Sequence, residues 1–432
     1  MKIVLEKIKN RFKEKDNKVL LSNFFSLSAL QIANFVLPLL TIPYLIRVLG
    51  VELYGLLAFA MAFIMYFMIL SDYGFNLTAT REISVYRDSK EKIIEIFSSV
   101  MIIKFLLMLC GLLILSIVVF SFEKFSKDWI IYYFTFGMVL GKVLFPIWFF
   151  QGMEKMKYIS ILNIIAKVFF LGAIFIFVQE KEDYYLVPIL NSLGFIISGL
   201  ISLYYIKKEF DISLKLQNID TLIFYLKDGW HIFFSNIAVV AYTSTNILIL
   251  GLLTNNVLVG YYAIAERVVG AVSTLGRIVN QVLFPHFSKL WTVNKELYYS
   301  KFKKVFFSII TIMFTIAVII SLLSSYIIWL LSNEYIETSI NILRILIFVV
   351  VLYPLGGLFT QSFIAQKKNY LVIRITLLTM LFNTILIFPL IKILGVYGVV
   401  VTVLSVQIFH LILNVTQYIK LKREEDLEKR KL

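Results

Sequence analysis

The chain has 432 residues, of which 60% are hydrophobic and only 16% are charged, and its formal net charge is +15. Soluble domains carry about 25% charged residues, so this composition excludes an ordinary soluble protein. The one cysteine, Cys110, excludes a disulfide framework and a cysteine metal site. We expect Cys110 to be a small buried residue, and we expect no metal and no cofactor.

Twelve apolar stretches, each long enough to cross a bilayer, fill almost the whole chain. A helix needs roughly 20 mostly apolar residues to span the hydrocarbon core. The segments that connect these stretches are short, so no soluble catalytic domain fits between them. The three histidines lie in no catalytic or metal-binding arrangement. We therefore predict an all-α integral membrane protein that is not an enzyme, with two six-helix lobes around a central cavity. The predicted spans are residues 20–46, 52–71, 93–120, 129–150, 158–178, 184–206, 230–253, 257–285, 303–331, 340–366, 370–391 and 396–419.

Basic residues are distributed unevenly between the loops. Thirty Lys and Arg residues precede the first span, occupy the even-numbered loops or follow the last span, whereas five lie in the odd-numbered loops. Loops rich in Lys and Arg remain in the cytoplasm. The bias predicts that both termini are cytoplasmic, and it explains most of the basic excess without a nucleic-acid partner.

The longest polar segment between spans divides the chain into two halves. On either side of it, residues 50–60 and 255–265 resemble each other, and each closes the first hairpin of its half. Six spans per half predict parallel repeats, for which the substrate site lies between the halves near the midplane. The predicted parts are a basic N-terminal segment, the first lobe, a cytoplasmic linker, the second lobe and a cytoplasmic tail: residues 1–18, 19–206, 207–229, 230–419 and 420–432.

Several basic residues lie inside the predicted spans. Each costs ~2.5–3.5 kcal/mol at the bilayer centre, and only Glu266 is a comparably deep acid, with Asp72 at a span end. The basic residues therefore cannot all be paired internally, and we predict a water-filled cavity that receives an anion. Helix pairing or snorkelling is the alternative. The candidate substrate-binding cations are Lys104, Lys142, Lys167, Arg267 and Arg277, and the candidate ion-coupling acids are Glu266 and Asp72.

Three stretches resemble a known family. Residues 145–158 (FPIWFFQGMEKMKY) and 72–84 (DYGFNLTATREIS) resemble segments of the Wzx-type O-antigen and polysaccharide flippases. Residues 183–188 (DYYLVP) are similar to the segment that enters span six of these proteins. Wzx-type flippases belong to the multidrug/oligosaccharidyl-lipid/polysaccharide exporter superfamily.

The resemblance implies a flippase of the bacterial inner membrane. It would move undecaprenyl-diphosphate-linked oligosaccharide repeat units, of O-antigen or capsule type, from the cytoplasmic to the outer leaflet by alternating access. The implied partners are this lipid-linked glycan and membrane lipids, with a polysaccharide polymerase and chain-length machinery as further candidates. The deep cations would receive the diphosphate, and Trp148 and Gln151 would offer aromatic and amide surfaces to the glycan.

Two other classes remain open. A drug/cation antiporter of the same superfamily would need acidic residues deep in its cavity, and only Glu266 meets that requirement. A polytopic polysaccharide polymerase would need large outer loops for glycosyl transfer, whereas the predicted outer loops have about ten residues or fewer.

The charge bias can be tested with topology reporters. Fusions at Lys124 and Lys181 should report a periplasmic location, and fusions at Lys90 and Lys215 a cytoplasmic one. A cytoplasmic signal at Lys181 would contradict the predicted topology.

Overall fold

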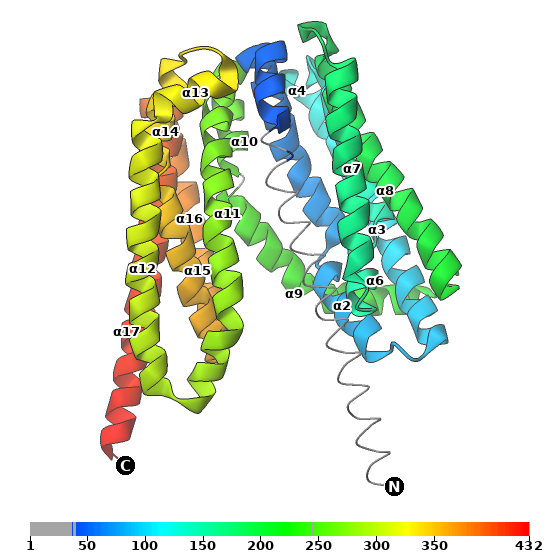
Figure 1. The fold of residues 1–432 in the computed structure, drawn as a ribbon. Coiled ribbons are helices and arrows are strands. Elements are labelled where there is room, and N and C mark those ends of the chain that lie inside the picture. Colours follow the sequence, from blue (N-terminus) through cyan, green and yellow to red (C-terminus); the bar gives the residue numbers. More distant parts are fainter. Residues whose placement is uncertain (1–36, 38–39, 244, 432) are drawn as a thin grey trace, which may run out of the picture. The chain divides into compact units, whose positions relative to one another are not determined.

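The computed structural model describes residues 37, 40–243 and 245–431, and within these ranges it contains helices and no strands. This confirms the all-α membrane protein. Ten of the described helical segments are long and apolar enough to cross a membrane, or eleven if the pair Ile219–Val240 and Thr245–Leu253 counts as one span. Most of the first predicted span lies outside the described residues. The helices, most of which are labelled in Figure 1, are α2 (Phe75–Val85), α3 (Lys90–Ser121), α4 (Glu123–Ser126), α5 (Trp129–Leu144), α6 (Ile147–Gly152), α7 (Met156–Phe177), the 3-10 helix η1 (Lys181–Tyr185), α8 (Leu186–Phe210), α9 (Ile219–Thr243), α10 (Thr245–Leu253), α11 (Asn256–Val293), α12 (Lys295–Leu322), α13 (Ser324–Ser332), α14 (Glu337–Leu346), α15 (Val349–Ala365), α16 (Asn369–Leu394) and α17 (Val396–Lys431).

A continuous helical run at residues 40–72 precedes α2. The segment Leu40–Val85 has 46 residues, about twice what one span requires. Gly50 has a φ of 78°, a left-handed conformation that a regular helix does not contain and that glycine adopts without steric cost. Gly50 therefore marks the junction that the sequence predicts between the first two spans.

The described residues form two compact units. Unit 1 contains the described residues up to Tyr44 and the segment Phe63–Ile237, and unit 2 contains Leu45–Ala62 and the chain from Ala238 onward. Each unit therefore includes a segment that a division of the sequence near residues 207–229 assigns to the other half.

The core of unit 1 forms where α2, α3 and α6 meet. Pro146 separates α5 from α6, because proline lacks the N–H that a continuous helix needs. The three aromatic residues that follow, Trp148, Phe149 and Phe150, are completely buried. Gly152 fits α6 closely against α2, since a Cβ at this position would lie 2.6 Å from Ile83.

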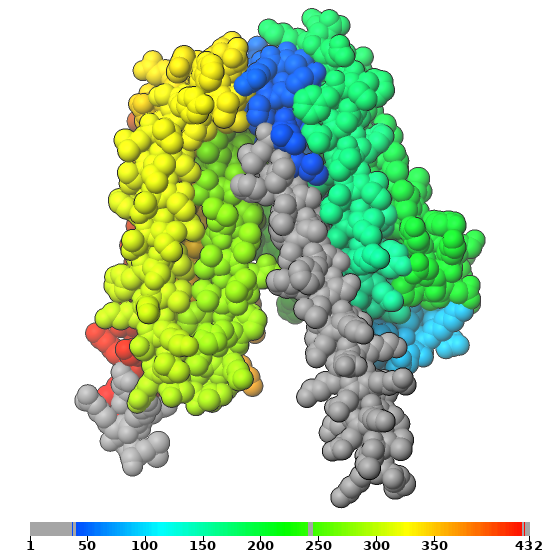
Figure 2. Space-filling view, in the orientation of Figure 1, coloured from blue at the N-terminus to red at the C-terminus, as the bar shows by residue number. Residues whose placement is uncertain are grey.

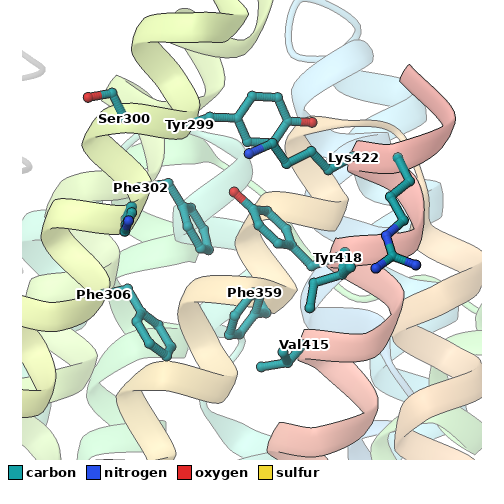
Figure 3. Close-up of a pocket in the computed structure, with 11 residues that line it drawn as sticks. Tyr299, Ser300, Phe302, Phe306, Phe359, Val415, Tyr418 and Lys422 are labelled. Atoms are coloured by element: carbon teal, nitrogen blue, oxygen red, sulfur yellow. The ribbon is translucent and has the colours of Figure 1, made fainter. Parts of the chain in front are cut away.

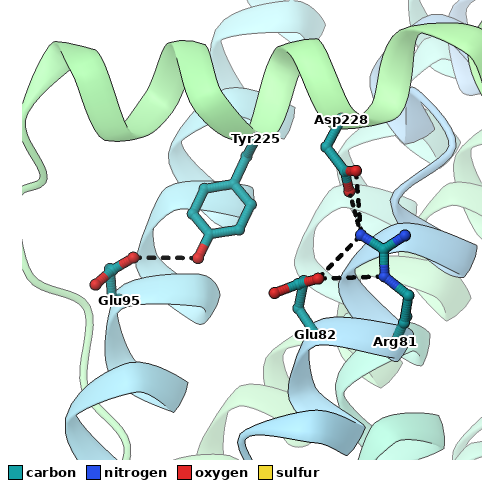
Figure 4. Close-up of polar contacts among 5 residues, drawn as sticks. All are labelled: Arg81, Glu82, Glu95, Tyr225 and Asp228. Carbon is teal, nitrogen blue, oxygen red and sulfur yellow. Dashed lines mark hydrogen bonds and ion pairs between the residues drawn. The ribbon is translucent and has the colours of Figure 1, made fainter.

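Helix α9 begins 11 residues before the predicted seventh span, within the segment predicted as a linker. Leu222, Tyr225 and Leu226 recur at helical spacing and pack on the core of unit 1. This amphipathic pattern explains why the segment is helical. The Tyr225 hydroxyl donates a 3.1 Å hydrogen bond to Glu95 on α3 (Figure 4).

An ion-pair network adds to the attachment of α9 to unit 1. The Arg81 guanidinium on α2 contacts Asp228 on α9 at 3.0 Å and Glu82 at 2.9 Å (Figure 4). The Tyr73 ring stacks on Phe233 of α9 with ring centroids 4.7 Å apart. The first half of α9 is thus fixed to unit 1 by polar and aromatic contacts.

The stretch between α8 and α9 is also attached to unit 1. Lys90 forms an ion pair with Asp211, which lowers the pKa of the Asp211 carboxyl. The backbone N–H of Lys215 donates a 3.0 Å hydrogen bond to the Ser98 hydroxyl. These contacts hold the connection to α9 along the N-terminal part of α3.

Unit 2 differs from the predicted spans at its third helix. Helix α12 ends at Leu322, and a separate helix, α13, follows, although the sequence predicts one span over 303–331. The Arg344 guanidinium donates hydrogen bonds of 3.0 and 3.1 Å to the hydroxyls of Ser324 and Ser325. These bonds fix the start of α13. Helices α12 and α13, yellow-green and yellow in Figure 2, cover much of the visible surface of unit 2.

The two segments that resemble each other in sequence pack together within unit 2. Gly55 and Gly260 occupy equivalent positions in residues 50–60 and 255–265. A Cβ on Gly55 would lie 1.9 Å from the Asn256 carbonyl oxygen, and one on Gly260 would lie 2.2 Å from that of Val51. Only glycine allows both backbones to approach this closely.

A second similarity relates the turns α6–α7 and α15–α16. Glu154 and Lys367 have φ values of 56° and 60°. In the next residue of each turn, Lys155 and Lys368, the backbone N–H donates a 2.8 Å bond to the carbonyl of a completely buried phenylalanine. The same turn thus closes corresponding hairpins in the two halves of the sequence, as internal repeats predict.

The glycine contact predicts the effect of a small substitution. Gly55→Ala should destabilise the protein by about 1–3 kcal/mol, because the new methyl group overlaps backbone atoms that cannot move away. Gly172→Ala is the control, since nothing lies within 4 Å of the added Cβ. The measurement is the thermal midpoint of the detergent-purified protein. Equal midpoints for the two variants would contradict the described packing.

Candidate functional site

The deepest cation of unit 1 has an acidic partner. Lys104 on α3 is 3% exposed, and its Nζ lies 3.6 Å from Oδ1 of Asp72. The sequence argument that the deep cations lack acids therefore needs a correction for Lys104. Asp72 lies at a span end in the sequence, but the packing of α3 brings Lys104 to it.

Lys142 is the second charged neighbour of Lys104. It lies on α5, which packs against α3, and its side chain is exposed. Two lysines and one aspartate give the group a positive balance. This group can attract an anion through the exposed Lys142, while Lys104 and Asp72 hold each other in place.

Lys167 lies on α7 and is half-buried. The sequence places Ser160 and Asn163 on the same helical face. Both are satisfied within α7: the Ser160 hydroxyl donates to the Met156 carbonyl at 3.3 Å, and the Asn163 amide donates to the Ile159 carbonyl at 2.8 Å. These two polar groups therefore need no ligand or neighbouring helix.

Unit 2 has an exposed polar stripe along α11. The exposed or half-buried residues of the stripe follow helical spacing, whereas Ser273, which the sequence places on this face, is buried and donates to the Val269 carbonyl at 2.7 Å. Gly270, Arg277 and Gln281 of the predicted face are exposed, as predicted, and Thr274 rather than Ser273 lies beside them. The members of the stripe are Arg267, Gly270, Thr274, Arg277 and Gln281.

Two arginines provide the charge of this stripe. Arg267 is exposed, and its electrostatic neighbours are Glu266 and the buried Tyr54. Arg277 donates a 2.7 Å hydrogen bond to the Thr274 hydroxyl. One acid against two arginines leaves the stripe positive. Tyr54 and Thr274 were not identified from the sequence, because neither carries a charge and only packing brings them to the arginines.

The structure does not place Trp148 and Gln151 on an exposed surface, as binding of a glycan to these two side chains would require. Trp148 is completely buried in the core of unit 1. Gln151 is half-buried, and its side-chain oxygen accepts a 3.3 Å hydrogen bond from the Thr80 hydroxyl. In this conformation Trp148 packs the core, and Gln151 connects α6 to α2. Cys110, expected to be buried, is exposed on α3.

No group of three or more His, Cys, Asp or Glu residues with metal-binding geometry occurs among the described residues. Each unit has its own candidate group of basic and polar side chains: Asp72, Lys104, Lys142 and Lys167 in unit 1, and the α11 stripe in unit 2.

Comparison with known families identifies the chain. Residues 20–291 match the model of a family described as polysaccharide biosynthesis protein. The chain belongs to this family. The match includes the three stretches that resemble Wzx-type flippases in sequence, and it also includes the α11 stripe. The family resemblance is therefore confirmed.

Two curated relatives are similar over nearly their full length. Both are named "Putative O-antigen transporter". The first, from Escherichia coli (strain K12), is 29% identical over 89% of this chain and 93% of its own length. The second, from Shigella dysenteriae, is 27% identical over 87% of this chain and 94% of its own length.

Solved structures with the same fold include two transporters. An inward-facing multidrug resistance MATE family transporter of the MOP superfamily has a TM-score of 0.71 at 14% identity, over 92% of this chain and 99% of its own. The lipid II flippase MurJ, in an inward closed conformation, has a TM-score of 0.72 at 16% identity, over 93% of this chain and 87% of its own. At these identities the similarity establishes the fold, which is that of a multi-pass membrane transporter.

The Lys104–Asp72 pair predicts a compensating double substitution. Asp72→Asn should destabilise the protein by about 3–5 kcal/mol, because it leaves a buried lysine without its acid. Adding Lys104→Gln should recover much of that loss, since the double variant buries no charge at the pair. The thermal midpoints of both variants and of wild type measure the coupling. If the second substitution recovers nothing, the pair makes no contribution to stability.

Proposed function

We propose that this protein flips an undecaprenyl-diphosphate-linked oligosaccharide, of O-antigen or capsule type, from the cytoplasmic to the outer leaflet by alternating access. The chain is a membrane transporter of the polysaccharide biosynthesis family, and two relatives are named for O-antigen transport. A fold neighbour is named as a lipid II flippase. The family and the relatives support a lipid-linked glycan as the substrate.

One observation carries the proposal: the two exposed arginines of the polar stripe on the membrane helix α11. Each basic residue at the bilayer centre costs ~2.5–3.5 kcal/mol on insertion scales. Arg267 and Arg277 are both exposed, and Glu266 lies beside Arg267. Exposure to lipid would be unfavourable, so we infer that the stripe lines the aqueous path of the head group. A diphosphate supplies the negative charge that this stripe lacks.

In unit 1, Lys142 and Lys167 are the cations that would attract the diphosphate. Lys142 is exposed beside the Asp72–Lys104 pair, and Lys167 is half-buried on α7. The lipid tail would remain in the bilayer while the charged head group crosses. Glu266 and Asp72 remain the candidate ion-coupling residues.

Drug/cation antiport is the less favoured function. A cation substrate needs free carboxylates, whereas Asp72 is paired with Lys104 and Glu266 lies beside Arg267. The structural similarity to a multidrug transporter concerns the fold alone.

The central test is Arg267→Ala in cells that depend on this protein for surface polysaccharide. Export should fall about tenfold, the loss expected when one charge-assisted contact to phosphate is removed. Arg267→Glu should be more severe because it repels the diphosphate, and Arg267→Lys should retain part of the export. The measurements are surface polysaccharide at matched protein abundance and accumulation of lipid-linked glycan in the inner leaflet.

The control is Lys392→Ala, an exposed cation at the end of α16. This variant also removes one positive charge, but at a position outside the α11 stripe, so cells that carry it should export polysaccharide normally. Normal export by Arg267→Ala and Arg277→Ala, singly and together, would contradict a role for the stripe in substrate binding.

A further inference from the structure

A groove lies on unit 2 between α12 and α17, with α15 as its floor (Figure 3). Its volume is about 670 Å³. That is the size of a site for a molecule or chain segment of several hundred daltons. None of the candidate substrate-binding residues lines it, so it is separate from the site described above.

The floor of the groove is aromatic. Phe302 and Phe359 are buried, and the Phe302 ring stacks on Tyr418 with centroids 4.6 Å apart. Phe306 on α12 and Val415 on α17 extend the apolar surface away from the charged end (Figure 3). Such a surface fits a hydrocarbon chain.

One end of the groove is basic. Lys303 on α12 and Lys422 and Arg423 on α17 are exposed at its edge. Two acids directly follow Arg423 on α17: Glu424 is exposed, and Glu425 accepts from Lys295 and from the Tyr299 hydroxyl at 2.6 Å each.

The three basic residues have no carboxylate within ion-pair distance among the described residues. Lys422 instead lies 5.0 Å from the centre of the Tyr299 ring. The groove therefore combines an unneutralised cationic end with an apolar body.

The sequence places this end of the groove at the membrane surface. α12 changes from a lysine-rich start to an apolar body near residue 305, and α17 changes from apolar to highly charged near residue 420. The charge bias predicts that this side is cytoplasmic. The cytoplasmic leaflet is rich in anionic lipids, and basic pockets between helices at its surface bind their head groups.

We propose that the groove binds an anionic phospholipid of the cytoplasmic leaflet. Its phosphate would lie among Lys303, Lys422 and Arg423, and one acyl chain would cover Phe306 and Phe359. A resident phospholipid fits this groove because the basic residues of its lining adjoin an apolar body that includes Phe306, Phe359 and Val415. Lipid binding here would be separate from the transport function and does not depend on it.

The test uses the purified full-length protein in neutral detergent, titrated with phosphatidylglycerol or phosphatidylcholine and followed by native mass spectrometry. Wild type should bind phosphatidylglycerol about tenfold more tightly than phosphatidylcholine. The groove variant Lys303→Gln/Lys422→Gln/Arg423→Gln should lose most of this preference. Phe306→Ala should weaken binding of phosphatidylglycerol, because the acyl chain loses its aromatic contact.

The chain offers a matched control on the same two helices. Lys301→Gln/Lys304→Gln/Lys420→Gln removes three exposed charges that do not line the groove, and it should retain the preference. Equal losses in both triple variants, or no preference in wild type, would overturn the proposal. Undecaprenyl diphosphate as competitor tests the other occupant: displacement of phosphatidylglycerol at a lower concentration than unlabelled phosphatidylglycerol requires would assign the groove to the substrate lipid. If the lipid-binding test fails but Arg267→Ala still loses export, the lipid proposal is wrong and the proposed transport function is unaffected.

Discussion

A charge within a membrane needs either a partner of opposite sign or access to water, and this requirement shapes the interior of both units. In unit 1, the buried Lys104 is held by Asp72 at 3.6 Å. In unit 2, Arg267 and Arg277 are exposed along α11, and Glu266 lies beside Arg267. The first arrangement is self-contained and stabilising. The second leaves positive charge for water and an anionic substrate, and it is the basis of the proposed diphosphate transport.

The residues that identify the family mainly position helices. Trp148 is completely buried in the core of unit 1, and Gly152 allows α6 to pack against Ile83. Tyr73 stacks on Phe233 and, with the Arg81–Asp228 ion pair, holds the first half of α9 to unit 1. The segment that connects the halves of the sequence is thus a packed part of one unit. The first half of α9 is therefore a structural part of unit 1.

The surface that the charge bias predicts to face the cytoplasm has a different electrostatic character from the interior. Lys295 and Glu425 neutralise each other, whereas Lys303, Lys422 and Arg423 line an aromatic groove and form no ion pair with another described residue. In the sequence these residues belong to the positive bias that orients the protein in the membrane. The structure adds that three of them gather around an apolar groove, which gives them a proposed second role in lipid binding.

The sequence by itself determined the all-α membrane architecture, the approximate spans and the family, because apolar length and local motifs are properties of contiguous residues. It also identified the deep cations, since their cost in a bilayer does not depend on packing. Only the tertiary structure decided which of them are paired, because Asp72 and Lys104 are 32 positions apart and meet only when α3 packs beside the preceding helix. Packing likewise buried Trp148 and Ser273 and brought Gly55 and Gly260 against each other's segments. Side-chain direction and helix contacts depend on neighbours that are distant in the chain, and a local sequence pattern does not specify those neighbours.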